Sequence, residues 1–152
     1  MAIAIVSQGN HTPDKWALTT AQIIFDLDGS LAGSRLLQAR GIQNQIAVIL
    51  SDYYDDLIDQ ERGDLEAFFD HCDSPYNVDK VAMVATFDIR ALLKGTPWED
   101  KAKDPEWVGD VARTIQTHLE TAMHVERLLF ADQNPTNPSA AAYRARFYGA
   151  SI

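Results

Sequence analysis

Residues 105–134, PEWVGDVARTIQTHLETAMHVERLLFADQN, decide the fold that we expect for this chain of 152 residues. Apolar side chains recur every three or four residues along this stretch, which is the spacing of one face of an α-helix. They are Val108, Val111, Ile115, Leu119, Ala122, Val125 and Leu129. Asp104 can cap the helix, Pro105 suits its first position, and Asn134 followed by proline ends it. The stretch therefore predicts one long amphipathic helix.

The rest of the chain shows the same periodicity. Helices are predicted at about residues 13–28, 34–62, 64–72 and 78–94, and a short one capped by Ser139 runs through Tyr143 and Phe147. The segment 96–99, TPWE, has the pattern of a capping box, and Ile23 and Val84 belong to stripes expected to face the core. We therefore predict an all-α bundle of about five helices, with a helical domain over residues 1–134 and an extended C-terminal tail or arm over residues 135–152.

The net charge of −9 is concentrated in one segment. Residues 52–73 contain nine acids and one base, so this segment carries −8 and the remainder is almost neutral. The last eighteen residues contain Arg144 and Arg146 and no acid. Direct binding of nucleic acid is not expected, because phosphate recognition needs concentrated lysine and arginine. The asymmetry instead predicts where a protein partner, or another copy of the chain, would bind.

We therefore predict a non-enzymatic protein that acts by self-association, as a homo-oligomer, or by binding a protein partner. Its contact residues would lie in the acidic segment and in the tail: Asp52, Asp55, Asp56, Asp59, Tyr143, Arg144, Arg146 and Phe147. In shape and composition the chain is similar to accessory proteins of tailed phages and prophages, such as head–tail connectors. An alternative is an acidic inhibitor that mimics nucleic acid and blocks a host defence protein.

One short motif suggests an enzyme instead. Residues 23–31 read IIFDLDGSL, which resembles the first motif of the haloacid dehalogenase superfamily of phosphatases. The resemblance implies a phosphoryl-accepting nucleophile at Asp26, a general acid/base at Asp28 and a Mg²⁺ ion that neutralises the phosphate. It also implies a buried strand before the motif, whereas here a helical stripe precedes it. The resemblance covers nine residues, and Asp88 lacks the acidic neighbour that the last motif of the family requires.

Other chemistry has little support in the sequence. His118 and His124 are six residues apart on the same predicted helix, about 240° around its axis, so they cannot bind one metal ion together. No metal or other cofactor is therefore expected outside the phosphatase alternative. We expect His118 to be a core-edge histidine held by one hydrogen bond, and Trp16, Trp98 and Trp107 to pack helix starts onto the core, with a ligand pocket as the alternative.

The sequence also indicates where the protein works. The first ten residues lack the positive charge and the long apolar run of a secretory signal. No stretch of eighteen apolar residues is present, so no membrane span is predicted. With its single cysteine, Cys72, the chain is expected in the cytoplasm or in a particle assembled there.

Overall fold

The computed structural model describes residues 14–27, 31–62 and 78–148, leaving out the side chains of residues 60–62, 147 and 148. These ranges contain α1 (Lys15–Ile24), α2 (Gly33–Arg62), α4 (Val78–Leu93), a 3₁₀-helix η1 (Lys101–Lys103), α5 (Pro105–Gln133) and α6 (Pro138–Tyr148). No strand occurs in them, which confirms the predicted all-α fold with about five helices. The predicted helix at residues 64–72 lies outside the described residues.

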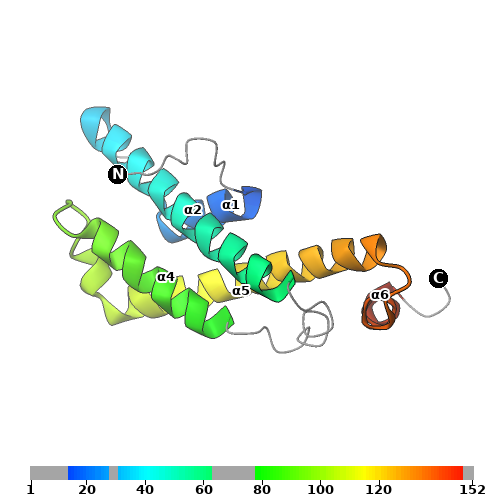
Figure 1. Cartoon of the computed structure of the whole chain (residues 1–152). Coiled ribbons are helices and arrows are strands. Elements are labelled where there is room, and N and C mark those ends of the chain that lie inside the picture. The colour runs from blue at the N-terminus through cyan, green and yellow to red at the C-terminus, as the bar shows by residue number, and fades with distance from the viewer. Residues whose placement is uncertain (1–13, 28–30, 63–77, 149–152) are drawn as a thin grey trace.

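Helix α5 is the element around which the others are arranged. It contacts α1, α2, α4, η1 and α6. Figure 1 shows α2 crossing the bundle diagonally, with the first turns of α2 extending beyond the other helices and α6 lying beside the far end of α5. Helix α2 continues without a break through Gly41 to Arg62, as the predicted helix over residues 34–62 requires.

The buried residues of α5 recur at every fourth position. Its buried side chains are Val111, Ile115, Leu119, Met123, Arg127 and Ala131. Because an α-helix turns about 100° per residue, each four-residue step moves the buried stripe about 40° around the axis. Over the five steps from Val111 to Ala131 the stripe therefore turns by roughly 200°, so the two ends of α5 bury nearly opposite sides.

This rotation corrects part of the predicted stripe. The first half of the prediction is confirmed, since Val111, Ile115 and Leu119 are almost completely buried. Val125 and Leu129 are about half exposed, so their predicted burial is wrong. They continue the face that the first half of α5 buries, but the helices packed on the second half lie on another side.

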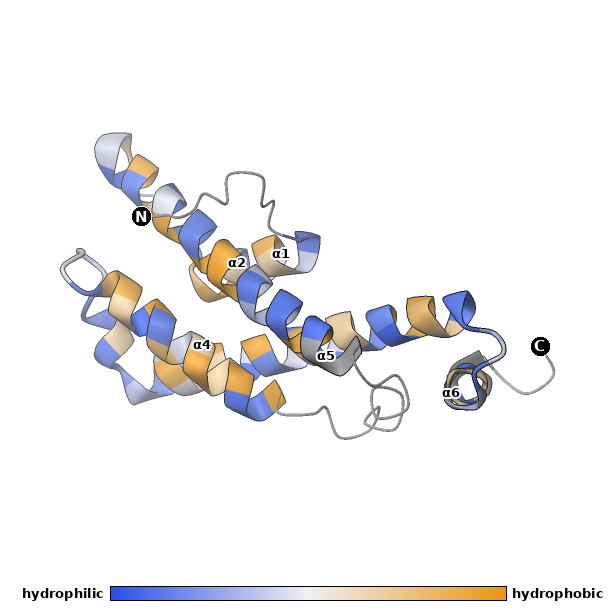
Figure 2. Ribbon diagram, in the orientation of Figure 1, coloured by the Kyte–Doolittle hydropathy of each residue, from blue (hydrophilic) through white to orange (hydrophobic). Residues whose placement is uncertain are grey.

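Two hydrophobic clusters result from this change of side. The first half of α5 packs against residues of α1, α2, η1 and α4 from Ala82 onwards, including Ile46, Leu50 and Ile89. The second half packs against the end of α2, the start of α4 and α6, through residues such as Leu57, Val78 and Tyr143. Trp16 packs against both clusters. Figure 2 shows the hydrophobic residues of α2 gathered where it passes α1.

Helix α1 is shorter than predicted. It ends at Ile24, where Phe25 leaves helical geometry and its N–H still binds the carbonyl oxygen of Ala21. The ring of Phe25 is buried edge-on against Trp98, with centroids 5.5 Å apart. Ile23 is mostly exposed, so its predicted place in the core is wrong. The early end of the helix turns Phe25, rather than Ile23, towards the core.

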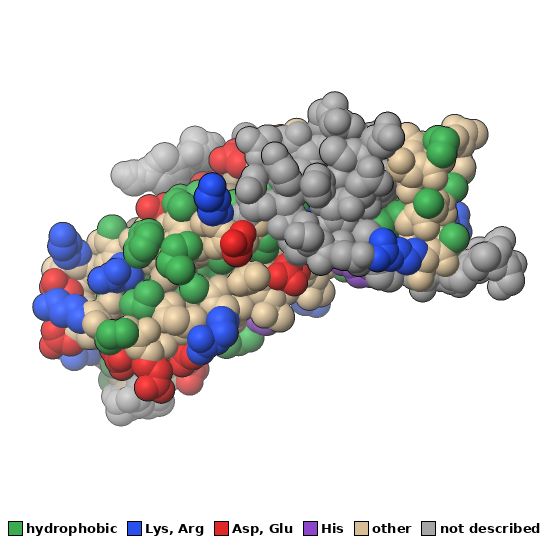
Figure 3. All heavy atoms as spheres, turned by 90° about the horizontal axis from the view of Figure 1, so that it is seen from below, with side chains coloured by type: hydrophobic (Ala, Val, Ile, Leu, Met, Phe, Trp, Pro, Cys, Tyr) green, Lys and Arg blue, Asp and Glu red, His purple; other side chains and the backbone are tan. Residues whose placement is uncertain are grey.

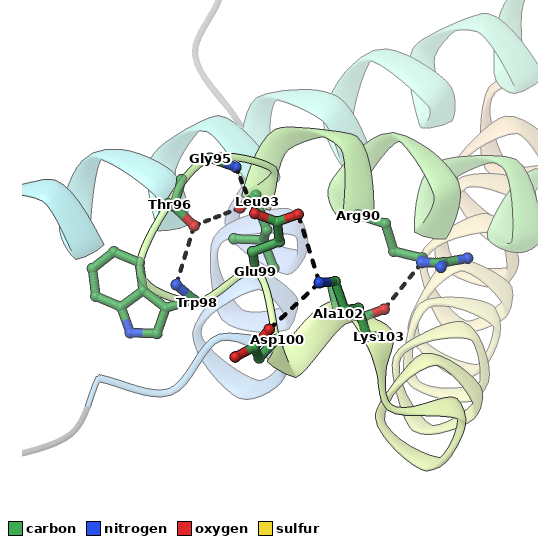
Figure 4. A network of polar contacts seen from close by, with 9 residues as sticks. All are labelled: Arg90, Leu93, Gly95, Thr96, Trp98, Glu99, Asp100, Ala102 and Lys103. Atoms are coloured by element: carbon green, nitrogen blue, oxygen red, sulfur yellow. Dashed lines mark hydrogen bonds and ion pairs between the residues drawn. The ribbon is translucent and has the colours of Figure 1, made fainter.

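A network of polar contacts forms the corner between α4 and η1 (Figure 4). Gly95 has a positive φ of 79°, and the carboxylate of Glu99 accepts its N–H at 3.1 Å. Thr96 donates its hydroxyl to the carbonyl oxygen of Leu93 at 2.6 Å and accepts the N–H of Trp98 at 3.2 Å. Thr96 thus accepts a backbone N–H as predicted, but Glu99 binds the N–H of Gly95 instead of that of Thr96. A series of turns and the short η1 follow instead of an α-helix.

The caps of the last two helices differ in how well they were predicted. Asp104 caps α5 as expected, its side chain accepting the N–H of Glu106 at 2.9 Å. The cap of α6 is Asn137 and not Ser139, since the Asn137 side chain accepts the N–H groups of Ser139 and Ala140. Pro138 then occupies the first helical position, where its missing N–H costs nothing.

The corner at Gly95 gives a direct stability prediction. Gly95→Ala should lower the free energy of unfolding by about 1–2 kcal/mol, because a residue with a Cβ atom is strained at positive φ. No atom lies within 4 Å of the added Cβ, so the effect isolates the backbone conformation.

Gly41→Ala is the matched control, measured by the same urea unfolding. Gly41 lies inside α2 and has equally open space around an added Cβ, so alanine should stabilise the chain by about 0.5–1 kcal/mol. Equal effects of the two substitutions would contradict the left-handed conformation of Gly95.

Candidate functional site

The predicted acidic contact residues lie on one exposed face of α2. Asp52, Asp55, Asp56 and Asp59 are all exposed, while Tyr54, Leu57 and Ile58 are buried against the second cluster. The four aspartates follow the helical spacing of neighbours on one face. The structure therefore brings these four carboxylates together on the surface, as the sequence predicted, and the other acids of the segment up to Asp73 fall outside the described side chains.

The predicted contact residues of the tail differ in their burial and in their contacts. Tyr143 is buried, and its hydroxyl lies 2.5 Å from Nδ1 of His124 on α5. Arg144 forms an ion pair with Asp132 of α5 at 3.4 Å. Arg146 is exposed, and the side chain of Phe147 lies outside the described residues. In this single chain Tyr143 and Arg144 thus attach α6 to its own bundle, while Arg146 lies on the surface.

The phosphatase motif does not have the setting that its resemblance implies. Ile23 and Ile24 form the last turn of α1 and not a buried strand. Asp26 is exposed after the end of that helix, and Asp28 lies outside the described residues. Among the described residues no group of three or more histidine, cysteine, aspartate or glutamate side chains could hold a metal ion. The strand expected from the resemblance is therefore wrong for this chain.

An apolar surface on α4 was missed by the sequence reasoning. Met83, Val84 and Phe87 are each about half exposed on the outer face of the helix, so the predicted burial of Val84 is wrong. Figure 3 shows hydrophobic side chains gathered on this side of the molecule between basic and acidic ones. The spacing of Met83 and Phe87, four residues apart, is a signal that could have revealed a second apolar stripe on α4.

A shallow hollow of about 290 Å³ continues the apolar surface towards η1. Phe87 and Ala91 line it together with the cations Arg90, Lys94 and Lys103 and with Glu99. The Arg90 guanidinium lies 6.0 Å from the centre of the Phe87 ring and donates to the carbonyl oxygen of Ala102 at 3.1 Å. The hollow therefore combines an aromatic wall with a net positive rim.

Asp88 has a structural partner on the next helix. It accepts a hydrogen bond from the hydroxyl of Tyr53 on α2. Burial, together with this bond and the negative charge of Asp88, raises the pKa of Tyr53 to about 12. Tyr53 thus stays protonated as a donor and links α2 to α4 beside the exposed face of α4.

The predicted hydrogen bond of His118 and the predicted packing of the three tryptophans onto the core are both confirmed. His118 Nδ1 lies 2.6 Å from Oγ1 of the buried Thr20. Trp16, Trp98 and Trp107 all pack against the first cluster. None of the described helices combines the length and the hydrophobicity needed to cross a bilayer.

The contact between α5 and α6 predicts a pH dependence. Burial, with a contribution from the nearby Arg127 guanidinium, lowers the pKa of His124 below its ordinary value of 6.5. Just below pH 6.5 the unfolded chain therefore binds a proton that the folded chain does not. Stability should fall as the pH drops through 6.5, until the lower pKa of the folded state is reached.

Urea unfolding between about pH 8 and pH 6 measures this effect, in a range where carboxylates stay ionised. His124→Asn should reduce the loss of stability over this range. Tyr143→Phe is the control, because it removes the hydroxyl that contacts His124 but keeps a titrating imidazole. It should lower the free energy of unfolding by about 1 kcal/mol without changing the pH profile in the same way. The same pH profile in the wild type and in His124→Asn would contradict the assignment.

Comparison of the chain with models of known protein families, with curated proteins and with solved structures finds no match. The candidate surfaces are therefore defined by the geometry of this chain. They are the apolar outer face of α4 with its basic hollow, and the acidic face of α2.

Proposed function

We propose that the chain is a non-enzymatic assembly protein that associates with further copies of itself. The observation that carries this proposal is the outer face of α4, where Met83, Val84 and Phe87 are exposed side by side. Apolar side chains that cluster on a surface with a polar rim are typical of protein contact sites. We call the surface formed by residues 83, 84, 87, 90, 91 and 94 the α4 face.

Charge complementarity supports a second copy as the partner. The hollow beside the α4 face has three cations against one carboxylate. The acidic face of α2 carries four exposed aspartates. The same chain thus presents an apolar surface with a basic rim and a separate acidic surface, and opposite charges favour their encounter.

A contact between two different surfaces of one chain has a consequence for the assembly. Such a head-to-tail contact produces a ring if its rotation closes and a filament if it does not. A component of a phage or prophage particle is one setting in which this behaviour would be used.

The acidic face also supports a second candidate function. Asp52, Asp55, Asp56 and Asp59 line one side of α2, so they could occupy the phosphate sites of a basic DNA-binding protein. A mimic of this kind would compete with duplex DNA for that protein. Changing the four aspartates to asparagine should abolish the competition, and unchanged competition would exclude mimicry.

Sedimentation velocity over a range of protein concentrations tests self-association. Phe87→Ser should weaken association roughly tenfold, because it removes an aromatic side chain that the contact would bury. High salt should weaken association as well, since the encounter depends partly on exposed charges.

Leu37→Ser is the matched control. Leu37 is 70% exposed near the start of α2, away from the α4 face, so its loss should leave association unchanged. A wild-type chain that stays monomeric at high concentration, or equal effects of the two substitutions, would overturn the proposal.

A further inference from the structure

A cavity of about 510 Å³ lies between α1, α2 and α5. Its walls include the aromatic rings of Trp16 and Tyr54, whose centroids are 5.4 Å apart, together with Ala122 and Val125 of α5. Val125 is about half exposed, so part of this apolar wall is open to a ligand. The volume lies within the usual range for small-molecule sites.

Polar side chains on the inner wall of the cavity are already hydrogen-bonded within the chain. The hydroxyl of Tyr54 donates to the carboxylate of Glu126 at 3.1 Å. Nδ1 of His118 lies 2.6 Å from Oγ1 of the buried Thr20. These groups therefore hold α1, α2 and α5 together, and a ligand is not needed to satisfy the atoms that form these bonds.

The other polar groups of the lining are in water or out of reach. Nε1 of Trp16 has no hydrogen-bond partner among the described residues, but it is shielded from solvent, so a ligand in the cavity would not reach it. The remaining polar side chains of the lining are exposed and can keep their polar ends in water: Asp14, Lys15, Thr19 and Thr121. The surface that a ligand would cover is therefore mainly apolar and aromatic.

We propose that this cavity binds a neutral, mostly apolar small molecule with an aromatic or aliphatic body. The body would pack against the rings of Trp16 and Tyr54 and against Val125, and water would be released from these side chains. The proposal does not depend on self-association, because the cavity lining shares no residue with the α4 face.

A charged group on the same body would weaken binding. An anion entering the cavity would lose hydration beside the carboxylate of Glu126. Lys15 is the cation of the lining, and it is exposed, so its charge is screened by solvent and offsets little of this cost. Preference for a neutral ligand over an anion of the same shape is therefore characteristic of the site.

Fluorescence titration of the full chain tests this preference with two dyes that share a phenylaminonaphthalene body. N-phenyl-1-naphthylamine is neutral, and 8-anilino-1-naphthalenesulfonate carries a sulfonate. We expect one neutral dye per chain, and at least roughly tenfold weaker binding of the sulfonate. High salt should leave binding of the neutral dye undiminished, because no ion pair contributes to it.

Variants on α5 place the dye in this cavity. Val125→Trp adds a large ring that leans towards the N-terminal end of α5, over the cavity, and should weaken binding of the neutral dye at least roughly tenfold. Thr117→Trp is the matched control, since Thr117 is exposed on the same helix outside the lining and should leave binding intact. Ala122→Leu fills the cavity from its wall and should also weaken binding.

Phe87→Ser separates this cavity from the α4 face, where an apolar dye could also bind. It should leave binding of the neutral dye unchanged, because Phe87 lies outside the cavity lining. The proposal is overturned if the neutral dye shows no saturable binding, if the sulfonate binds as tightly, or if Phe87→Ser abolishes binding. Wild-type binding by both Val125→Trp and Ala122→Leu would overturn it as well.

Discussion

The four-residue step of the buried stripe on α5 is the constraint on which the rest of the structure depends. A stripe that turns around the helix cannot be covered from one side, so different parts of the bundle cover its two ends. The first cluster takes α1, the first part of α2 and η1, and the second takes the end of α2 and α6. Between them Trp16 contacts both clusters and lines a cavity of about 510 Å³ that is bordered by α1, α2 and α5. The cavity thus lies where the covering of α5 passes from one group to the other.

Much of the fold could be predicted because local signals dominate it. The caps and prolines mark the start of α5, and Gly95 marks the turn after α4. The errors arise where tertiary contacts decide. A regular amphipathic pattern assumes one buried face, which placed Val125 in the core, and periodicity could not indicate that Arg127 would be buried. Ile23 is exposed because the buried face of α1 runs through Ala17, Thr20, Ala21 and Ile24. Phe25 is buried because it lies just beyond the end of α1, and the position of a helix end is weakly encoded.

The candidate surfaces were predictable to different degrees. Exposure of the acidic face follows from composition, because aspartates on a helix remain in water unless they are paired. The apolar α4 face could not be separated from the core by pattern alone, since Val84 and Ala85 are both apolar and only packing decides which is covered. The hydrogen bond between His118 and Thr20 joins residues ninety-eight positions apart in sequence, and such a pair has no local signal.

If the acidic face of one copy binds the α4 face of the next copy, a single contact explains both surfaces. A charge exchange between two variants tests this most directly. One variant carries Arg90→Glu and Lys94→Glu, and the other carries Asp52→Lys, Asp55→Lys, Asp56→Lys and Asp59→Lys. Sedimentation velocity is measured for each variant alone and for their mixture. We expect association in the mixture only, because each altered surface then meets an opposite charge. Association of either variant alone, or none in the mixture, would contradict it.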